Sequence, residues 1–269
     1  MHAARNARAH RAARVGAVMA VMAAVPLPTA AYATPTPIAA ARSTGTASRA
    51  GDQPTVLAAS SLTKVLPAIT PGARFSFAGS DTLAFQIQQG APADVFAAAS
   101  PRYPQQLFRQ GLVSQPRPFA SNSLVMVVPR ANPAHITGLA DLTRDGVRLV
   151  IGDTGVPVGD YTRQALARLG LSDALRNVVS LEPDVKGVTA KVALGEADAG
   201  FVYVTDVRPV RGRVRAFRLP AAARVDVEYQ VAVVARAPHP AAARAFVRRL
   251  LSPAGRRALV DHGFGVPAG

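Results

Sequence analysis

The chain of 269 residues contains no cysteine and no tryptophan, and aromatic residues make up only 6% of it. The absence of cysteine excludes disulfide bonds, thiolate metal sites, thiol catalysis and a lipid-bearing cysteine anchor. The scarcity of aromatic side chains disfavours a pocket that stacks sugars or organic rings. Aliphatic material is plentiful, since 49% of the residues are hydrophobic. A core of that size supports one large domain or two modest ones.

Acidic residues are also few, with 16 against 31 basic residues and a formal net charge of +15. Such a balance indicates a nucleic-acid or acidic-surface partner in some proteins. Here the basic residues are scattered, no nucleic-acid-binding motif is present, and few aromatic side chains are available to stack on bases. We therefore attribute the charge to a basic leader and an arginine-rich composition, and we expect no nucleic-acid partner.

Residues 1–33 have the pattern of a secretory signal peptide. A basic segment ends at Arg14, an apolar run follows over residues 15–25, and the small-residue pattern that ends at Ala33 offers a cleavage site. Prolines interrupt the apolar run well short of the ~20 residues that span a bilayer, which favours cleavage over a membrane anchor. The sequence therefore predicts an exported protein, periplasmic or on the extracellular face of the cytoplasmic membrane.

Residues 34–53 are rich in Thr, Pro, Ala, Ser and Gly and show no apolar periodicity. This composition predicts a flexible tether between the signal peptide and the folded part of the chain.

Short strand patterns alternate with helical ones from Pro54 onward. We expect strands over residues 55–59, 74–78, 94–98, 123–128, 148–151, 199–204 and 227–235. Two helices are expected to close the chain, one around Phe246 and Leu250 and one over 253–260. Pro67 and Pro71 predict a very short helix after the first strand. The alternation predicts an α/β fold with mostly parallel sheets covered by helices on both faces.

Four turns that follow strands are small or hydroxylic. They are Ser60-Ser61, Gly79-Ser80, Pro157-Val158-Gly159 and Val185-Lys186-Gly187. Ligands of open parallel sheets gather at the carboxyl ends of the strands, where helix N-termini present free N–H groups that suit an anion. A single serine in such a turn is most often only a helix cap. Spacing alone does not show whether the four turns converge.

An enzyme is the rival class, but its usual signatures are missing. The chain has no Gly-x-Ser-x-Gly elbow, and no Gly-Lys-Ser/Thr follows the glycines between residues 152 and 159. Three histidines remain beyond the predicted signal peptide, far apart in sequence: His135, His239 and His262. We therefore expect no catalytic residues, no cofactor and no site for a free metal cation.

Several blocks resemble, in order, those of periplasmic molybdate-binding proteins. The opening strand with Ser60-Ser61, the run from Phe77 to Leu83 and the block Gly90-Ala91-Pro92-Ala93-Asp94 carry most of the likeness. Further matches are Asn122-Ser123-Leu124-Val125, Gly152-Asp153, Val156 to Gly159, Asp184 to Gly187, Ala199 to Tyr203, Tyr229 to Val234 and Gly263-Phe264. The resemblance spans about residues 55–264, nearly the whole chain beyond the tether.

The resemblance implies a two-lobed, periplasmic-binding-protein-like fold of type II with the ligand in the cleft. Lobe 1 would comprise residues 54–123 plus 233–269, and lobe 2 residues 124–232. It implies that molybdate or tungstate is held by Ser61 and Ser80 from one lobe, by the backbone N–H groups of Val158 and Val185 from the other, and by the Tyr203 hydroxyl.

It further implies a monomer that delivers the anion to the permease and ATPase subunits of an ABC importer. Two alternatives stay open at this point: a binder of another oxyanion such as sulfate, and a ligand-sensing domain of a transcription regulator.

Overall fold

The computed structural model describes residues 53–267. The predicted signal peptide over 1–33 and nearly all of the predicted tether over 34–53 lie outside the described residues. The described part forms one compact unit that contains two five-stranded sheets.

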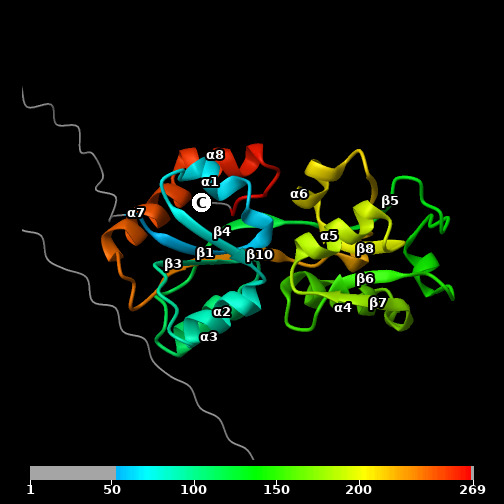
Figure 1. Cartoon of the computed structure of the whole chain (residues 1–269), viewed down its shortest axis with the longest axis horizontal. Helices are drawn as coiled ribbons and strands as arrows, with labels where there is room; N and C mark the ends of the chain where they lie inside the picture. Colours follow the sequence, from blue (N-terminus) through cyan, green and yellow to red (C-terminus); the bar gives the residue numbers. More distant parts are fainter. Residues whose placement is uncertain (1–52, 268–269) are drawn as a thin grey trace, which may run out of the picture. The chain divides into compact units, whose positions relative to one another are not determined.

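The first sheet has the strand order β2-β1-β3-β10-β4. Its strands are β1 (Thr55–Ala59), β2 (Arg74–Ala78), β3 (Val95–Ala98), β4 (Arg117–Asn122) and β10 (Val227–Val233). Helices α1 (Val65–Ile69), α7 (Pro240–Leu251) and α8 (Pro253–Asp261) lie on one face, and α2 (Ser80–Gln88) and α3 (Arg102–Arg109) lie on the other (Figure 1). The short α1, with Pro67 inside it, confirms the very short helix expected after the first strand.

The second sheet has the order β7-β6-β8-β5-β9. Its strands are β5 (Leu124–Pro129), β6 (Leu149–Gly152), β7 (Val178–Glu182), β8 (Ala199–Tyr203) and β9 (Val214–Arg218). Helices α4 (Pro157–Arg168), α5 (Val185–Leu194) and α6 (Val204–Val207) cover it. The second sheet and its surroundings also contain short 3-10 helices, and one more follows β1: Ser60–Leu62 (η1), Leu139–Thr143 (η2), Ser172–Asn177 (η3), Arg208–Val210 (η4) and Ala221–Ala223 (η5).

Both sheets are mixed, whereas the sequence predicted mostly parallel ones. In the first sheet β1 pairs parallel with β2 and β3, but β10 pairs antiparallel with β3 and β4. In the second sheet β6 pairs parallel with β7 and β8, but β5 pairs antiparallel with β8 and β9. The antiparallel pairs all involve β5 or β10, which continue from the segments that cross between the sheets.

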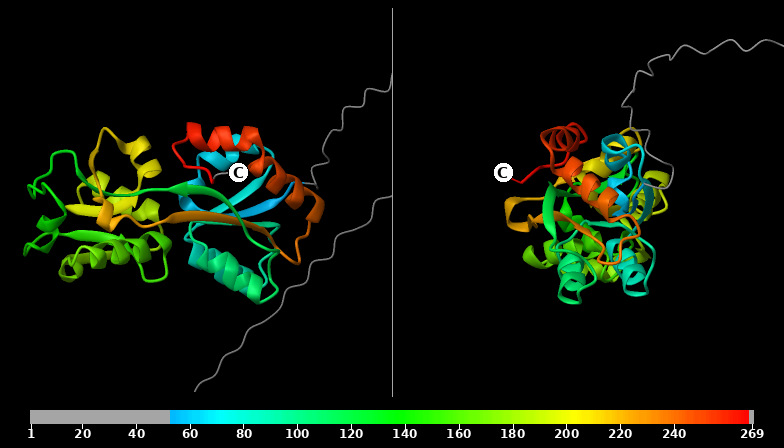
Figure 2. Two further views of the ribbon diagram at one scale, coloured as in Figure 1. Left: turned by 180° about the vertical axis from the view of Figure 1, so that it is seen from behind. Right: turned by 90° about the vertical axis from the view of Figure 1, so that its left-hand side faces the viewer.

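The chain crosses between the sheets twice, and Figure 2 shows these two connections. The first crossing falls at Ser123, between β4 and β5. The second lies between β9 and β10. Because all of β10 pairs within the first sheet, the sheets divide before Val227 and not at 232/233. The lobe boundaries as such stay a prediction.

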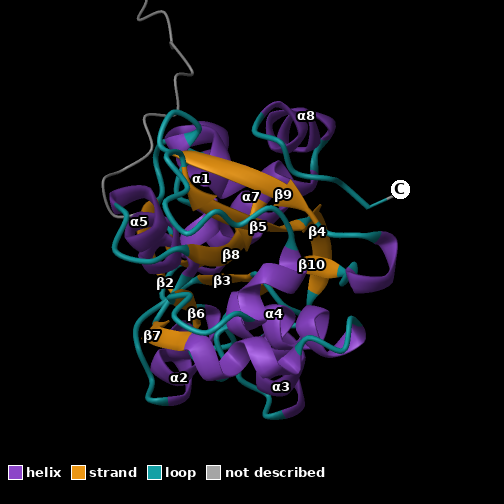
Figure 3. Ribbon diagram, turned by 90° about the vertical axis from the view of Figure 1, so that its right-hand side faces the viewer, coloured by secondary structure: helices purple, strands orange, loops and turns teal. Residues whose placement is uncertain are grey.

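Figure 3 shows the strands together with the helices that surround them. Every residue of β3, β5 and β8 is buried, the pattern of strands that are covered on both faces. In the part of the chain from 53 to 267, no helix has the length and apolar character needed to cross a bilayer.

Candidate functional site

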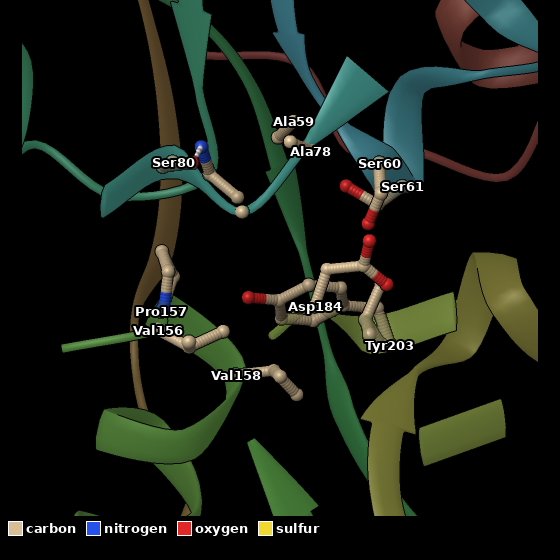
Figure 4. A pocket seen from close by; sticks show the side chains of 13 residues that line it. Ala59, Ser60, Ser61, Ala78, Ser80, Val156, Pro157, Val158, Asp184 and Tyr203 are labelled. Atoms are coloured by element: carbon tan, nitrogen blue, oxygen red, sulfur yellow. Dashed lines mark hydrogen bonds between the residues drawn. The ribbon is translucent and has the colours of Figure 1, made fainter. Parts of the chain in front are cut away.

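All five residues that the resemblance singled out line one small cavity between the two sheets. The lining consists of Ala59, Ser60, Ser61, Ala78, Gly79, Ser80, Ala99, Val156, Pro157, Val158, Asp184, Val185 and Tyr203 (Figure 4). Its volume is about 10 Å³. The four turns noted in the sequence therefore converge, which their spacing alone did not show.

Ser80 is the first residue of α2 and follows β2 through Gly79. It is 1% exposed, and its Oγ accepts a hydrogen bond from the Ala99 backbone N–H at 3.0 Å. Because Oγ acts as the acceptor in that bond, the hydroxyl proton of Ser80 is left to donate elsewhere. An acceptor bound in the cavity could take this hydrogen bond from Ser80.

Ser61 lies in η1, directly after β1, and its hydroxyl belongs to a short chain of hydrogen bonds. Its Oγ is 2.9 Å from the Tyr229 hydroxyl, which also accepts from Asn122 Nδ2 at 3.4 Å. Either hydroxyl of the Ser61–Tyr229 pair can be the donor. In the arrangement in which Tyr229 donates, the proton of Ser61 is available to an anion in the cavity.

Val158 and Val185 contribute helix N-termini from the second sheet. They are the second residue of α4 and the first residue of α5, and the first N–H groups of a helix have no acceptor inside it. The cap of α5, Asp184, accepts from the N–H groups of Lys186 at 2.6 Å and Gly187 at 3.1 Å. The Val185 N–H is not taken by this cap. Both helix ends add partial positive charge to the cavity.

Tyr203 ends β8 and is 1% exposed. Its hydroxyl has no hydrogen-bond partner among the residues that the structure describes. In Figure 4 this hydroxyl points into the middle of the cavity. Burial raises the pKa of Tyr203 well above its ordinary value, so the phenol stays protonated and can donate. A buried donor without a partner is costly in a folded protein, and a bound acceptor would remove that cost.

Two further residues of the candidate site were not predicted from the sequence. Asp184 brings a carboxylate into the lining, although the expected donors were all neutral. The position of Asp184 directly before a helix predicts an N-cap, but it does not predict that the residue lines a cavity. Tyr229 lies 168 residues from Ser61 in the sequence, so only the fold reveals that it orients that serine.

Among the residues that the structure describes, no Lys or Arg lines this cavity. Within residues 53–267, no group of three or more His, Cys, Asp or Glu side chains is arranged to hold a metal ion. The arrangement offers hydroxyl and backbone donors around a space of a few ångströms. Chemically it can hold a small anion by hydrogen bonds from several directions.

The known proteins that this chain resembles include several solute-binding proteins. Residues 54–265 match the family model described as bacterial extracellular solute-binding protein. The molybdate-binding protein ModA of Mycobacterium tuberculosis is 43% identical over 194 residues, which cover 72% of this chain and 73% of the relative. ModA of Escherichia coli is 33% identical over 226 residues, covering 78% of this chain and 88% of that protein.

A solved structure, the periplasmic molybdate-binding protein of Azotobacter vinelandii, superposes with a TM-score of 0.70 at 23% identity. The match covers 80% of this chain and 100% of that one. At this identity the likeness shows the two-lobed fold, and the fold by itself does not identify a ligand.

Proposed function

The chain belongs to the bacterial extracellular solute-binding proteins, and from this premise we propose that it captures molybdate between its lobes and delivers it to an ABC importer. The observation that carries the proposal is the Tyr203 hydroxyl, a buried donor without a partner that points into a cavity lined by other donors. Molybdate is a tetrahedral dianion without a proton at neutral pH, so all its oxygens accept hydrogen bonds. A set of convergent donors matches that need.

Ser61, Ser80, Val158, Val185 and Tyr203 are the proposed ligands. The two serines and the tyrosine would donate from side chains, and the two valines from the backbone. Because binding draws on both sheets, the ion would favour the arrangement in which the lobes are together. The permease would recognise that closed form.

The proposal includes no chemical reaction, and the family relatives named above are binding proteins. We propose that the protein acts as an exported monomer after cleavage behind Ala33, and that it uses no cofactor. Mass spectrometry of the secreted protein should find an N-terminus at or near Thr34. An intact Met1 in a cytosolic fraction would contradict export and would favour the ligand-sensing domain of a regulator.

Titration calorimetry of the mature protein with molybdate, tungstate, sulfate and phosphate tests the ligand. We expect molybdate and tungstate to bind most tightly, because the donors would be spaced for metal–oxygen bonds longer than those of sulfate. Hydrogen bonds weaken steeply beyond about 3.2 Å. If sulfate binds as tightly as molybdate, the protein is a general oxyanion binder. If none of the four anions binds, the proposal is wrong.

A further inference from the structure

A second, larger cavity adjoins the proposed molybdate pocket. Its volume is about 240 Å³, against about 10 Å³ for the pocket. The first sheet with its helices contributes Ser61, Lys64, Val65, Asp261, His262 and Phe264, and the second contributes Lys186, Thr205, Arg208 and Pro209. This space has room for several water molecules.

The lining of the larger cavity is basic. Lys64, Lys186 and Arg208 line it, and among the lining residues that the structure describes Asp261 is the one acidic residue. The charge of Lys186 is partly offset, because its Nζ lies 2.6 Å from the buried Asp206 Oδ1. Arg208 is committed as well, since its Nη1 donates to the Asp261 carbonyl oxygen at 2.7 Å. Lys64 is exposed and forms no salt bridge with any residue between 53 and 267.

The two cavities are linked through the chain itself. Ser61 lines both of them. Lys186 lines the larger cavity and follows Val185, which lines the pocket. An anion in the larger cavity therefore lies next to two of the proposed ligand positions.

We propose that the larger cavity is an entry chamber, in which a small oxyanion is first held with its water shell by Lys64 and its basic neighbours. The inference rests on the proposed function. Among the described residues, the pocket lining offers uncharged donors and one carboxylate, and the partial charges of its two helix ends act within about a turn of the helix, so the pocket exerts little long-range attraction on a dianion. Positive charge at the walls of a cleft raises the local concentration of an anion and its association rate. The basic chamber supplies the attraction that the pocket lacks.

The test is a stopped-flow measurement of molybdate association and dissociation, followed by tyrosine fluorescence at low and high salt. Lys64→Gln should lower the association rate about two- to fivefold at low salt and leave the dissociation rate unchanged. The difference should disappear at high salt, because salt screens exposed charges. Lys64→Arg should restore the rate. Arg215→Gln, an exposed position on β9 outside both cavities, removes the same charge and should change neither rate.

An association rate for Lys64→Gln equal to that of Arg215→Gln would overturn the entry chamber. So would a faster dissociation with unchanged association, because Lys64 would then contact the bound ion. These outcomes are distinct from failure of the proposed function, in which the unmodified protein shows no molybdate signal in either the kinetics or calorimetry.

Discussion

Gly79 lies so close to the carbonyl oxygen of Pro183 that a Cβ added to it would meet that oxygen at 2.4 Å. Gly79 follows β2 in the first sheet, and Pro183 follows β7 in the second. The dihedral angles of Gly79, φ −60° and ψ 143°, are open to any residue. A Cβ there would also meet Asp81 Oδ1 at 2.5 Å, but that atom ends a side chain that can turn, whereas the Pro183 carbonyl belongs to the backbone. The approach of the two lobes, and not the backbone conformation of Gly79, therefore sets the stronger restriction on this position.

Gly79→Ala should leave the fold of each lobe intact and weaken molybdate binding. The lobes would have to separate to relieve the contact with a backbone atom that cannot move alone. We expect at least about a tenfold loss of affinity, or about 1.4 kcal/mol, by calorimetry. Gly72→Ala is the matched control, because a Cβ there meets nothing within 4 Å. Equal affinities of the two variants would show that the contact does not limit closure.

Tyr203→Phe should have opposite effects on binding and on stability. Removing a hydroxyl that donates to a charged oxygen costs about 1.5–3 kcal/mol of binding. The ligand-free protein should gain about 1 kcal/mol or more in its free energy of unfolding, because a buried group without a partner is removed. Calorimetry and urea unfolding without ligand measure the two effects. A variant that loses stability and keeps its affinity would place this hydroxyl outside the binding site.

Ser61→Ala and Ser80→Ala should each lower molybdate affinity about ten- to a hundredfold. Tyr229→Phe should also lower it, because the Tyr229 hydroxyl orients Ser61 at 2.9 Å. A double-mutant cycle separates this path from a direct role. In the Ser61→Ala background, Tyr229→Phe should cost little or nothing further. Additive losses would mean that Tyr229 acts on the ion independently of Ser61.

The buried tyrosines predict a loss of stability in alkali. Burial raises the pKa of Tyr203 and of Tyr229 above the ordinary value of 10.0. Above pH 10 the unfolded chain therefore releases phenolic protons that the folded chain keeps, and folding is disfavoured. Each such tyrosine should lower the free energy of unfolding by about 1.4 kcal/mol per pH unit until its folded pKa is reached.

Urea unfolding between pH 8 and pH 12 measures this slope. Tyr203→Phe should remove the contribution of Tyr203 to this slope. Near pH 8 the variant should show only the gain in stability that comes from removing a buried hydroxyl without a partner. A slope that is the same in the variant would show that Tyr203 ionises equally in both states.

The sequence predicted the central strands well, because their residues are almost entirely apolar. Strand β1 has the expected bounds, and α8 ends one residue later than expected. Strand β2 also has the expected bounds, although it lies at the edge of the first sheet. The other edge strands of the two sheets, β4, β7 and β9, were not predicted. In β9, Arg215 and Arg218 interrupt the apolar pattern, since only Val214 is buried. Helix α3 contains Pro104, which reads as a helix breaker in sequence.

The five proposed ligand positions came from resemblance, and the fold brings them to one cavity. The contacts around each donor could not be predicted from the sequence. The contact between Gly79 and Pro183 joins residues of different sheets. The carboxylate of Asp184 serves as an ordinary helix cap and lines the cavity at the same time. Such relations depend on how the lobes meet, and no local pattern encodes them.

Asn122 ends β4, immediately before the chain crosses to the second sheet, and its Nδ2 donates to Thr205 Oγ1 at 2.9 Å as well as to Tyr229. The hydrogen bonds that aim Ser61 at the cavity therefore start at the hinge between the lobes. Bending this hinge would turn the serine away from the ion and withdraw the donors of the opposite lobe in the same movement. Under the proposed function, a permease that separates the lobes would weaken binding of the ion directly, and no competing anion would be needed to displace it.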